Sequence, residues 1–64
     1  MTLINGKDIT LTNISVKDYL LQNNYDLSKI AVELNEEILP KSEYESTIIG
    51  ESDVLEVVSF VGGG

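Results

Sequence analysis

The side chains of this sequence include few groups that could carry out chemistry. There is no cysteine and no histidine, which excludes thiol nucleophiles, zinc-binding cysteine sets and imidazole bases. The 11 acidic residues show no calcium-loop spacing, and the four lysines are scattered along the chain. Ser15 has no base to activate it and is better explained as a helix cap. We therefore expect a protein that is not an enzyme and that binds neither a metal ion nor a cofactor.

One reactive group remains, the α-carboxylate of Gly64 at the end of the segment VSFVGGG. Gly62, Gly63 and Gly64 form a thin tail that can enter a channel too narrow for side chains. A carboxylate is a poor electrophile, so another protein must activate it, most simply as an acyl-adenylate made from ATP. Displacement of AMP by a sulfur nucleophile would then leave a thiocarboxylate. From the residues alone, the alternative is a frayed terminus without a role.

Length and charge limit the partners of this chain. Its 64 residues are enough for one small domain. The net charge of -7 repels nucleic acid and anionic membrane surfaces, and it favours a protein partner with a basic docking surface. There is no apolar run of transmembrane length and no signal-peptide pattern, so we expect a cytoplasmic protein.

The first elements that must position the tail are a hairpin and a helix. Asn5-Gly6 is typical of a type I′ turn, and a two-residue loop places Leu3 opposite Asp8 on the outer side of the hairpin. The residues expected to point inward are Ile4, Ile9 and Leu11. Ser15 and Asp18 resemble a capping box, which predicts a helix from residue 16 to residue 23 or 24.

Alternation predicts the strands that follow. Residues 30–34 should form a strand with Ile30, Val32 and Leu34 inward, and a short edge strand should end before Pro40. We expect a 3₁₀ turn at residues 41–44, after which Ile48 and Ile49 enter the core.

The last strand leads directly into the tail, and the charge of Glu56 sets its phase. An outward Glu56 places Leu55 and Val57 inward, so Val58 and Phe60 lie on the opposite face.

The predicted order is β-β-α-β-β-β, an α+β fold with one helix packed across one face of a mixed sheet. Residues 1–61 form this domain, and residues 62–64 form the tail. The uncovered face would carry Leu3, Val58 and Phe60 as an apolar patch that leads into the tail through Val61. Beside a tail that must enter a partner, this patch is predicted to be a docking surface.

The strand-hairpin-helix order, the segment LNEEILP and the ending DVLEVVSFVGGG resemble the ThiS family, the sulfur carrier proteins of thiamine biosynthesis. The resemblance covers the whole chain and departs from the family in having Ser52-Asp53 where members often have Gly-Asp before the last strand. It implies a ubiquitin-like β-grasp fold with a five-stranded sheet. It also implies that an E1-like adenylyltransferase uses ATP to adenylylate Gly64, that a persulfide-bearing donor protein supplies sulfur, and that thiazole synthase receives it.

Two other functions fit the same residues. The first is a molybdopterin-synthase-type small subunit, which uses the same tail chemistry in another pathway, although such chains are usually longer. The second is a ubiquitin-like binding module that makes no covalent bond through its tail.

Overall fold

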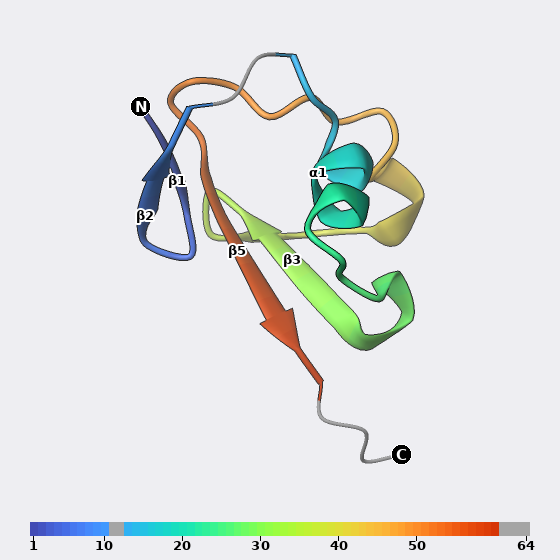
Figure 1. The fold of residues 1–64 in the computed structure, drawn as a ribbon. Helices are drawn as coiled ribbons and strands as arrows, with labels where there is room; N and C mark the ends of the chain where they lie inside the picture. The colour runs from blue at the N-terminus through green and yellow to red at the C-terminus, as the bar shows by residue number, and fades with distance from the viewer. Residues whose placement is uncertain (11–12, 61–64) are drawn as a thin grey trace.

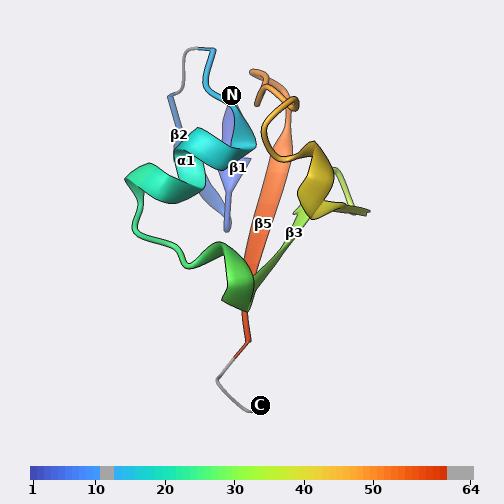
Figure 2. The same cartoon turned by 90° about the vertical axis from the view of Figure 1, so that its right-hand side faces the viewer.

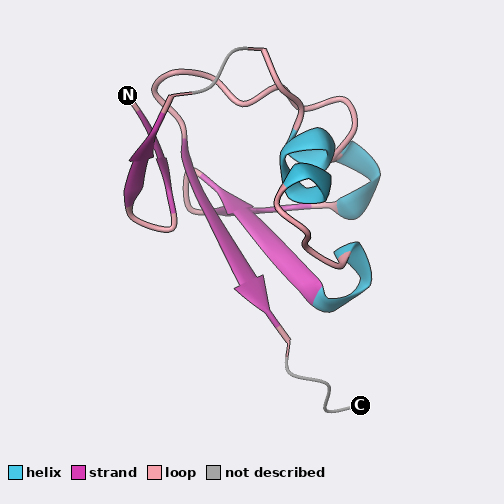
Figure 3. Ribbon diagram, in the orientation of Figure 1, coloured by secondary structure: helices cyan, strands magenta, loops and turns pink. Residues whose placement is uncertain are grey.

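A five-stranded sheet with one α-helix across one of its faces makes up the fold (Figures 1 and 3). The computed structural model describes residues 1–10 and 13–60. In chain order, the elements are β1 (Thr2–Ile4), β2 (Lys7–Ile9), α1 (Val16–Gln22), the 3₁₀ turn η1 (Leu27–Lys29), β3 (Ile30–Leu34), β4 (Glu37–Leu39), the 3₁₀ turn η2 (Lys41–Glu43) and β5 (Val54–Ser59). The predicted order of strands and helix is confirmed.

The first and last strands of the chain lie side by side in the middle of the sheet. The strand order is β2-β1-β5-β3-β4, in which β5 is parallel to β1 and antiparallel to β3. The sheet is therefore mixed, as predicted. β4 is an edge strand that ends immediately before Pro40, which has no N–H to donate to a further strand.

The β1–β2 hairpin has the predicted turn and register. Asn5 and Gly6 have positive φ angles of 51° and 82°, the backbone geometry that a type I′ turn requires. Leu3 is opposite Asp8, and Ile4 is opposite Lys7. Two residues with low steric cost at positive φ thus fix the register of the whole hairpin.

The helix α1 begins where the cap predicts. The Ser15 hydroxyl oxygen accepts a hydrogen bond from the Asp18 backbone N–H at 3.0 Å, and Val16 is the first helical residue. The helix ends at Gln22, one or two residues earlier than expected, and Asn24 follows with a positive φ of 64°. With seven residues, α1 is far too short to span a membrane, and no other helix in residues 1–10 and 13–60 could do so.

The core lies between α1 and one face of the sheet (Figure 2). Its buried apolar residues are Ile4, Val16, Leu20, Ile30, Val32, Tyr44, Ile49 and Leu55. The inward phases predicted for β1, β3 and β5 are confirmed, while Leu11 lies outside the described residues. Tyr44 was not predicted to be buried, because its neighbours in the sequence are both charged.

The prediction that Ile48 and Ile49 both enter the core is wrong for Ile48. Ile49 is 3% exposed, whereas Ile48 is 52% exposed. Ile48 forms a β-bridge with Ser15, and the Ile49 N–H donates to the Ile14 carbonyl at 2.9 Å. The segment is therefore extended at this point, and successive side chains of an extended backbone point to opposite sides.

The β3–β4 turn places a glutamate where glycine would fit better. Asn35 and Glu36 have φ angles of 54° and 72°. The left-handed conformation costs an L-residue about 1–2 kcal/mol, and glycine removes that cost but loses about 0.5–1 kcal/mol of chain entropy. We expect Glu36→Gly to raise the free energy of unfolding by up to about 1 kcal/mol, measured by urea denaturation.

The matched control is Glu36→Gln, which removes the same charge but keeps the side-chain carbon that causes the strain. It should change the free energy of unfolding by less than about 0.5 kcal/mol. If the glutamine variant gained as much stability as the glycine variant, the effect would be due to charge and the backbone argument would fail.

Candidate functional site

The strand β5 leads toward the glycine tail, and its side chains alternate between the two faces of the sheet. Leu55 is fully buried, and Val57 packs against the core. Val58 and Phe60 are 51% and 55% exposed, and alternation with the buried Leu55 places them on the face away from the core. The phase predicted from Glu56 is confirmed. By register and alternation, this outer face carries Leu3, Asp8, Ala31, Glu33, Ile38, Val54, Glu56, Val58 and Phe60.

Phe60 is fixed in place by the turn η1. Its backbone N–H donates to the Lys29 carbonyl at 2.7 Å, which continues the β3–β5 ladder beyond the last residue of β5. Asp26 caps η1, because its carboxylate accepts from the Ser28 hydroxyl at 2.7 Å and from the Ser28 N–H at 3.0 Å. These two hydrogen bonds hold the pKa of Asp26 below its usual value. The tail therefore begins next to a residue whose position on the sheet is fixed by hydrogen bonds.

The remaining predicted site residues follow Phe60 in the chain. Val61, Gly62, Gly63 and Gly64 lie outside the described residues. Phe60 is the last residue before them whose contacts are known.

The prediction that Leu3 is continuous with Val58 and Phe60 is wrong. Leu3 lies on the outer face as predicted, but it is half-buried and pairs with Val54 at the start of β5. Val54 and Val58 are four residues apart, which is about 13 Å along a strand. Glu56 separates them on this face, and the direct cross-strand neighbour of Val58 is Ala31. The apolar surface next to the tail thus consists of Val58, Phe60 and Ala31.

Two like charges are directly opposite each other in the middle of the outer face. Glu56 is directly opposite Glu33, and Glu33 is in turn opposite Ile38, which is 67% exposed. Sequence reasoning placed both glutamates outward but could not show that they are paired, because pairing depends on the order of strands in the sheet. Like charges directly opposite each other destabilise a sheet.

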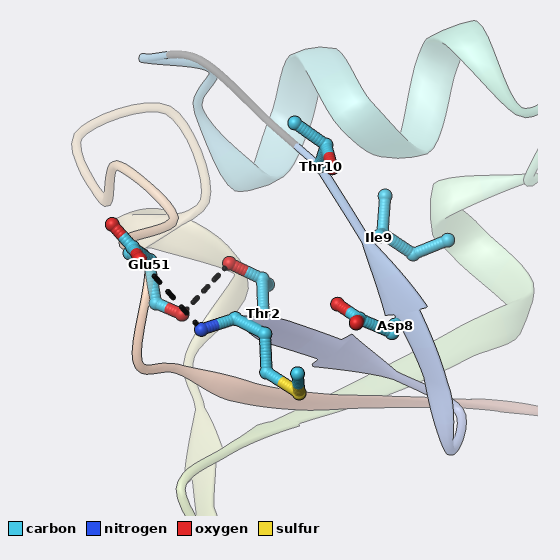
Figure 4. Close-up of a pocket in the computed structure, with 6 residues that line it drawn as sticks. Thr2, Asp8, Ile9, Thr10 and Glu51 are labelled. Carbon is cyan, nitrogen blue, oxygen red and sulfur yellow. Dashed lines mark hydrogen bonds and ion pairs between the residues drawn. The ribbon is translucent and has the colours of Figure 1, made fainter.

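A hollow near the N-terminus, lined by residues that include Thr2, Asp8 and Glu51, has no catalytic arrangement (Figure 4). It has a volume of about 500 Å³ and lies at the start of β1, which is beside the start of β5 and away from Phe60. The Thr2 hydroxyl donates to the Gly50 carbonyl at 2.8 Å, and the Met1 ammonium lies 3.8 Å from the Glu51 carboxylate. In the described part of the chain, no three acidic, histidine or cysteine side chains are grouped so that they could hold a metal ion.

Comparison with known proteins identifies the family. The sequence profile of the ThiS family matches residues 2–64. The chain is 35% identical over 66 residues to the sulfur carrier protein ThiS of Bacillus subtilis (strain 168), and the alignment covers 100% of both chains. It is also 40% identical over 63 residues to a thiazole synthase of Paramagnetospirillum magneticum (strain ATCC 700264 / AMB-1), covering 97% of this chain but only 19% of that protein.

A solved structure agrees with the sequence comparison. The crystal structure of the thiamine biosynthesis protein ThiS from Geobacter metallireducens superposes with a TM-score of 0.80 at 28% identity, and the match covers 98% of this chain and 97% of that one. The chain therefore belongs to the ThiS family of thiamine-biosynthesis sulfur carriers and has the ubiquitin-like β-grasp fold.

Proposed function

We propose that this chain carries sulfur as a thiocarboxylate on the α-carboxyl group of Gly64. The carboxylate attacks the α-phosphorus of ATP in an E1-like adenylyltransferase and releases pyrophosphate. A persulfide on a donor protein then attacks the acyl carbon, and AMP leaves. A thiol cleaves the resulting acyl disulfide by forming a disulfide with the donor sulfur, which leaves the thiocarboxylate on Gly64.

The match of the ThiS profile through residue 64 is the observation that carries this proposal, because it includes all three tail glycines. The end-to-end alignment with the Bacillus sulfur carrier supports it as well. The geometry is compatible, since the contact between the Phe60 N–H and the Lys29 carbonyl holds the chain firmly four residues before Gly64. In this proposal the folded domain binds the partner proteins, and the chemistry takes place on the tail.

The proposed receiver of the sulfur is thiazole synthase. In the Paramagnetospirillum relative, a segment similar to this chain is part of a protein that bears that name. In our proposal the carrier is a co-substrate of both the adenylyltransferase and the synthase, and it is not itself an enzyme.

The proposal is tested by forming the thiocarboxylate and detecting it. The protein is incubated with the adenylyltransferase of the same organism, ATP and a persulfide donor, then alkylated and fragmented from its C-terminus. Replacing one oxygen by sulfur adds about 16 Da, nearly the same as oxidation, so the alkylated Gly64 fragment must be observed. If ATP–pyrophosphate exchange and alkylation both fail, the chain is not a sulfur carrier of this kind.

The outer face next to the tail is the proposed docking surface for the adenylyltransferase. We expect Phe60→Ala to leave the melting temperature nearly unchanged, because Phe60 is already 55% exposed. Truncation of an aromatic interface anchor commonly costs about 2 kcal/mol, so the affinity for the enzyme should fall roughly 30-fold. Isothermal titration calorimetry measures the change.

Leu21→Ala is the matched control for this prediction. Leu21 is 51% exposed but lies on α1, which covers the other face of the sheet. Its truncation should leave the affinity unchanged. Equal losses in the two variants would show that Phe60 has no special role in docking.

A further inference from the structure

The pairing of β1 with β5 stops before β5 ends. The Leu3 N–H donates to the Asp53 carbonyl at 3.1 Å, and the Asn5 N–H donates to the Leu55 carbonyl at 2.9 Å. The chain turns at Asn5, and its side-chain oxygen accepts from the Val57 N–H at 2.8 Å. An amide side chain thus takes the place of the next backbone carbonyl, and it completes the last bond between the two strands.

The remaining backbone groups on this side of β5 have no partner strand. Phe60 bonds to the β3 side, and in an extended strand successive residues alternate between sides, so residues 55, 57 and 59 face β1. Beyond the Asn5 contact, the Val57 carbonyl and the Ser59 N–H point to an edge with no strand among the described residues. Figure 1 shows β5 continuing past the turn of the hairpin.

The two outer edges of the sheet are protected, but this inner edge is not. β4 has three residues and ends before Pro40, and β2 has three residues that include the exposed charges of Lys7 and Asp8. Short strands, prolines and charges are the features that prevent another chain from pairing with an edge. Residues 57–59 are Val-Val-Ser and have none of these features.

The charge next to this edge identifies what could pair with it. Glu56 lies on the outer face beside the open stretch and is directly opposite Glu33. Lys7 shares the inward side of Ile4, and Lys17 and Lys41 lie in α1 and η2. Lys29, at the end of η1, is opposite Phe60 and therefore four positions along the ladder from Glu56, so no lysine of this chain is a direct cross-strand neighbour of Glu56. A basic side chain brought next to Glu56 would offset the repulsion between the two glutamates.

We propose that an extended segment of the adenylyltransferase adds to the sheet along residues 57–59 of β5, with a lysine or arginine beside Val58 whose long side chain reaches diagonally to Glu56. The inference rests on the proposed function. Main-chain pairing of this kind gives affinity and fixes the register of the two chains. Because the paired residues are only five to seven positions before Gly64, their register sets how far the tail reaches into the enzyme.

N-methylation of single backbone amides tests the pairing, since a chain of 64 residues is accessible to chemical synthesis. N-methyl-Ser59 blocks the open edge without removing a hydrogen bond within the domain. N-methyl-Asp8 is the matched control. The backbone groups of Leu3 bond to β5, so Leu3 and Asp8 are a pair that exchanges no backbone hydrogen bonds. The Asp8 N–H therefore points away from β1, toward the outer edge of the sheet.

We expect both modified chains to melt like the parent. N-methyl-Ser59 should bind the adenylyltransferase at least roughly tenfold more weakly, because one hydrogen bond is lost and a methyl group separates the two strands. N-methyl-Asp8 should bind like the parent. If methylation prevents folding, hydrogen exchange of the unmodified chain replaces this measurement: only the Ser59 amide should gain protection in the complex.

Glu56→Gln tests the charge of the added segment. It should weaken binding roughly two- to fivefold at low salt and reduce the dependence of binding on salt. Glu43→Gln removes the same charge from η2, outside the sheet, and is the matched control. If the two variants lose affinity equally, the basic side chain next to Glu56 is not present.

The results also separate this inference from the function on which it rests. If the parent exchanges pyrophosphate and N-methyl-Ser59 does so with the same affinity, strand addition is wrong and the sulfur-carrier proposal stands. Equal weakening by N-methyl-Asp8 overturns strand addition in the same way. If the parent chain shows no exchange at all, both proposals fail.

Discussion

Leu55→Ala is expected to leave most of the protein unfolded near physiological temperature. Leu55 has no exposed surface and lies opposite Ile4 of β1 and Leu34 of β3, in the middle of the sheet. Truncation of a buried leucine to alanine costs about 2–5 kcal/mol. Domains typically have a total stability of only about 5–15 kcal/mol, and one of 64 residues is expected near the lower end of that range. Thermal and urea denaturation followed by circular dichroism measure the loss.

The neighbouring residue provides the control for this prediction. Val54 belongs to the same strand but is 39% exposed on the outer face. Val54→Ala should therefore cost less than about 1 kcal/mol. A Leu55→Ala variant with a cooperative melt close to that of the parent would contradict the buried position of this side chain.

Changes at the end of the tail are expected to abolish adenylylation without affecting the fold. Deleting Gly64 keeps a glycine tail and a terminal carboxylate but shortens its reach by roughly 3.3–3.6 Å. A misplacement of about 1 Å can cost on the order of a hundredfold in rate when reacting groups must be aligned. Adding one alanine after Gly64 lengthens the tail instead, so the carboxylate lies farther from the domain and a methyl group is added beside it. Both variants should fail in ATP–pyrophosphate exchange with the adenylyltransferase.

Binding separates a failure of chemistry from a failure of docking in these two variants. Neither change alters Val58, Phe60 or the core, so both proteins should melt and bind the enzyme like the parent. Exchange at the parental rate in either variant would show that Gly64 is not the activated residue. A ubiquitin-like binding module would then be the better interpretation.

Local patterns in the sequence predict much of this fold. Asn5-Gly6 determines the hairpin because few residue pairs accept two positive φ angles, and Ser15 determines where α1 begins because its oxygen can accept an orphan helix N–H. The alternation around Glu56 and Val32 gives the correct inward phase of both central strands. These features depend only on near neighbours in the chain, and the sequence contains that information directly.

Features that depend on pairing between distant segments could not be predicted in the same way. Ile48 and Ile49 are equally apolar, and only the bridge between Ile48 and Ser15 shows which of them is exposed. The burial of Tyr44 likewise depends on packing and not on its charged neighbours.

In the candidate site, too, features set by near neighbours were predictable and features set by strand pairing were not. The exposure of Val58 and Phe60 was predictable from the phase of β5. The position of Leu3 beside Val54, and the pairing of Glu33 with Glu56, required the strand order and register.

The parallel arrangement of β1 and β5 has a mechanical consequence. When Met1 and the end of β5 are pulled apart, the two strands slide in opposite directions along their common axis. The bonds that join them, from Leu3 to Asp53, from Asn5 to Leu55 and from Val57 to the Asn5 side chain, are then loaded together in shear and do not open one at a time. The antiparallel ladder with β3 lies on the other side of β5 and must slide at the same moment. An enzyme that draws the tail inward thus pulls on the central strand of the sheet, which is bonded to β1 on one side and to β3 on the other.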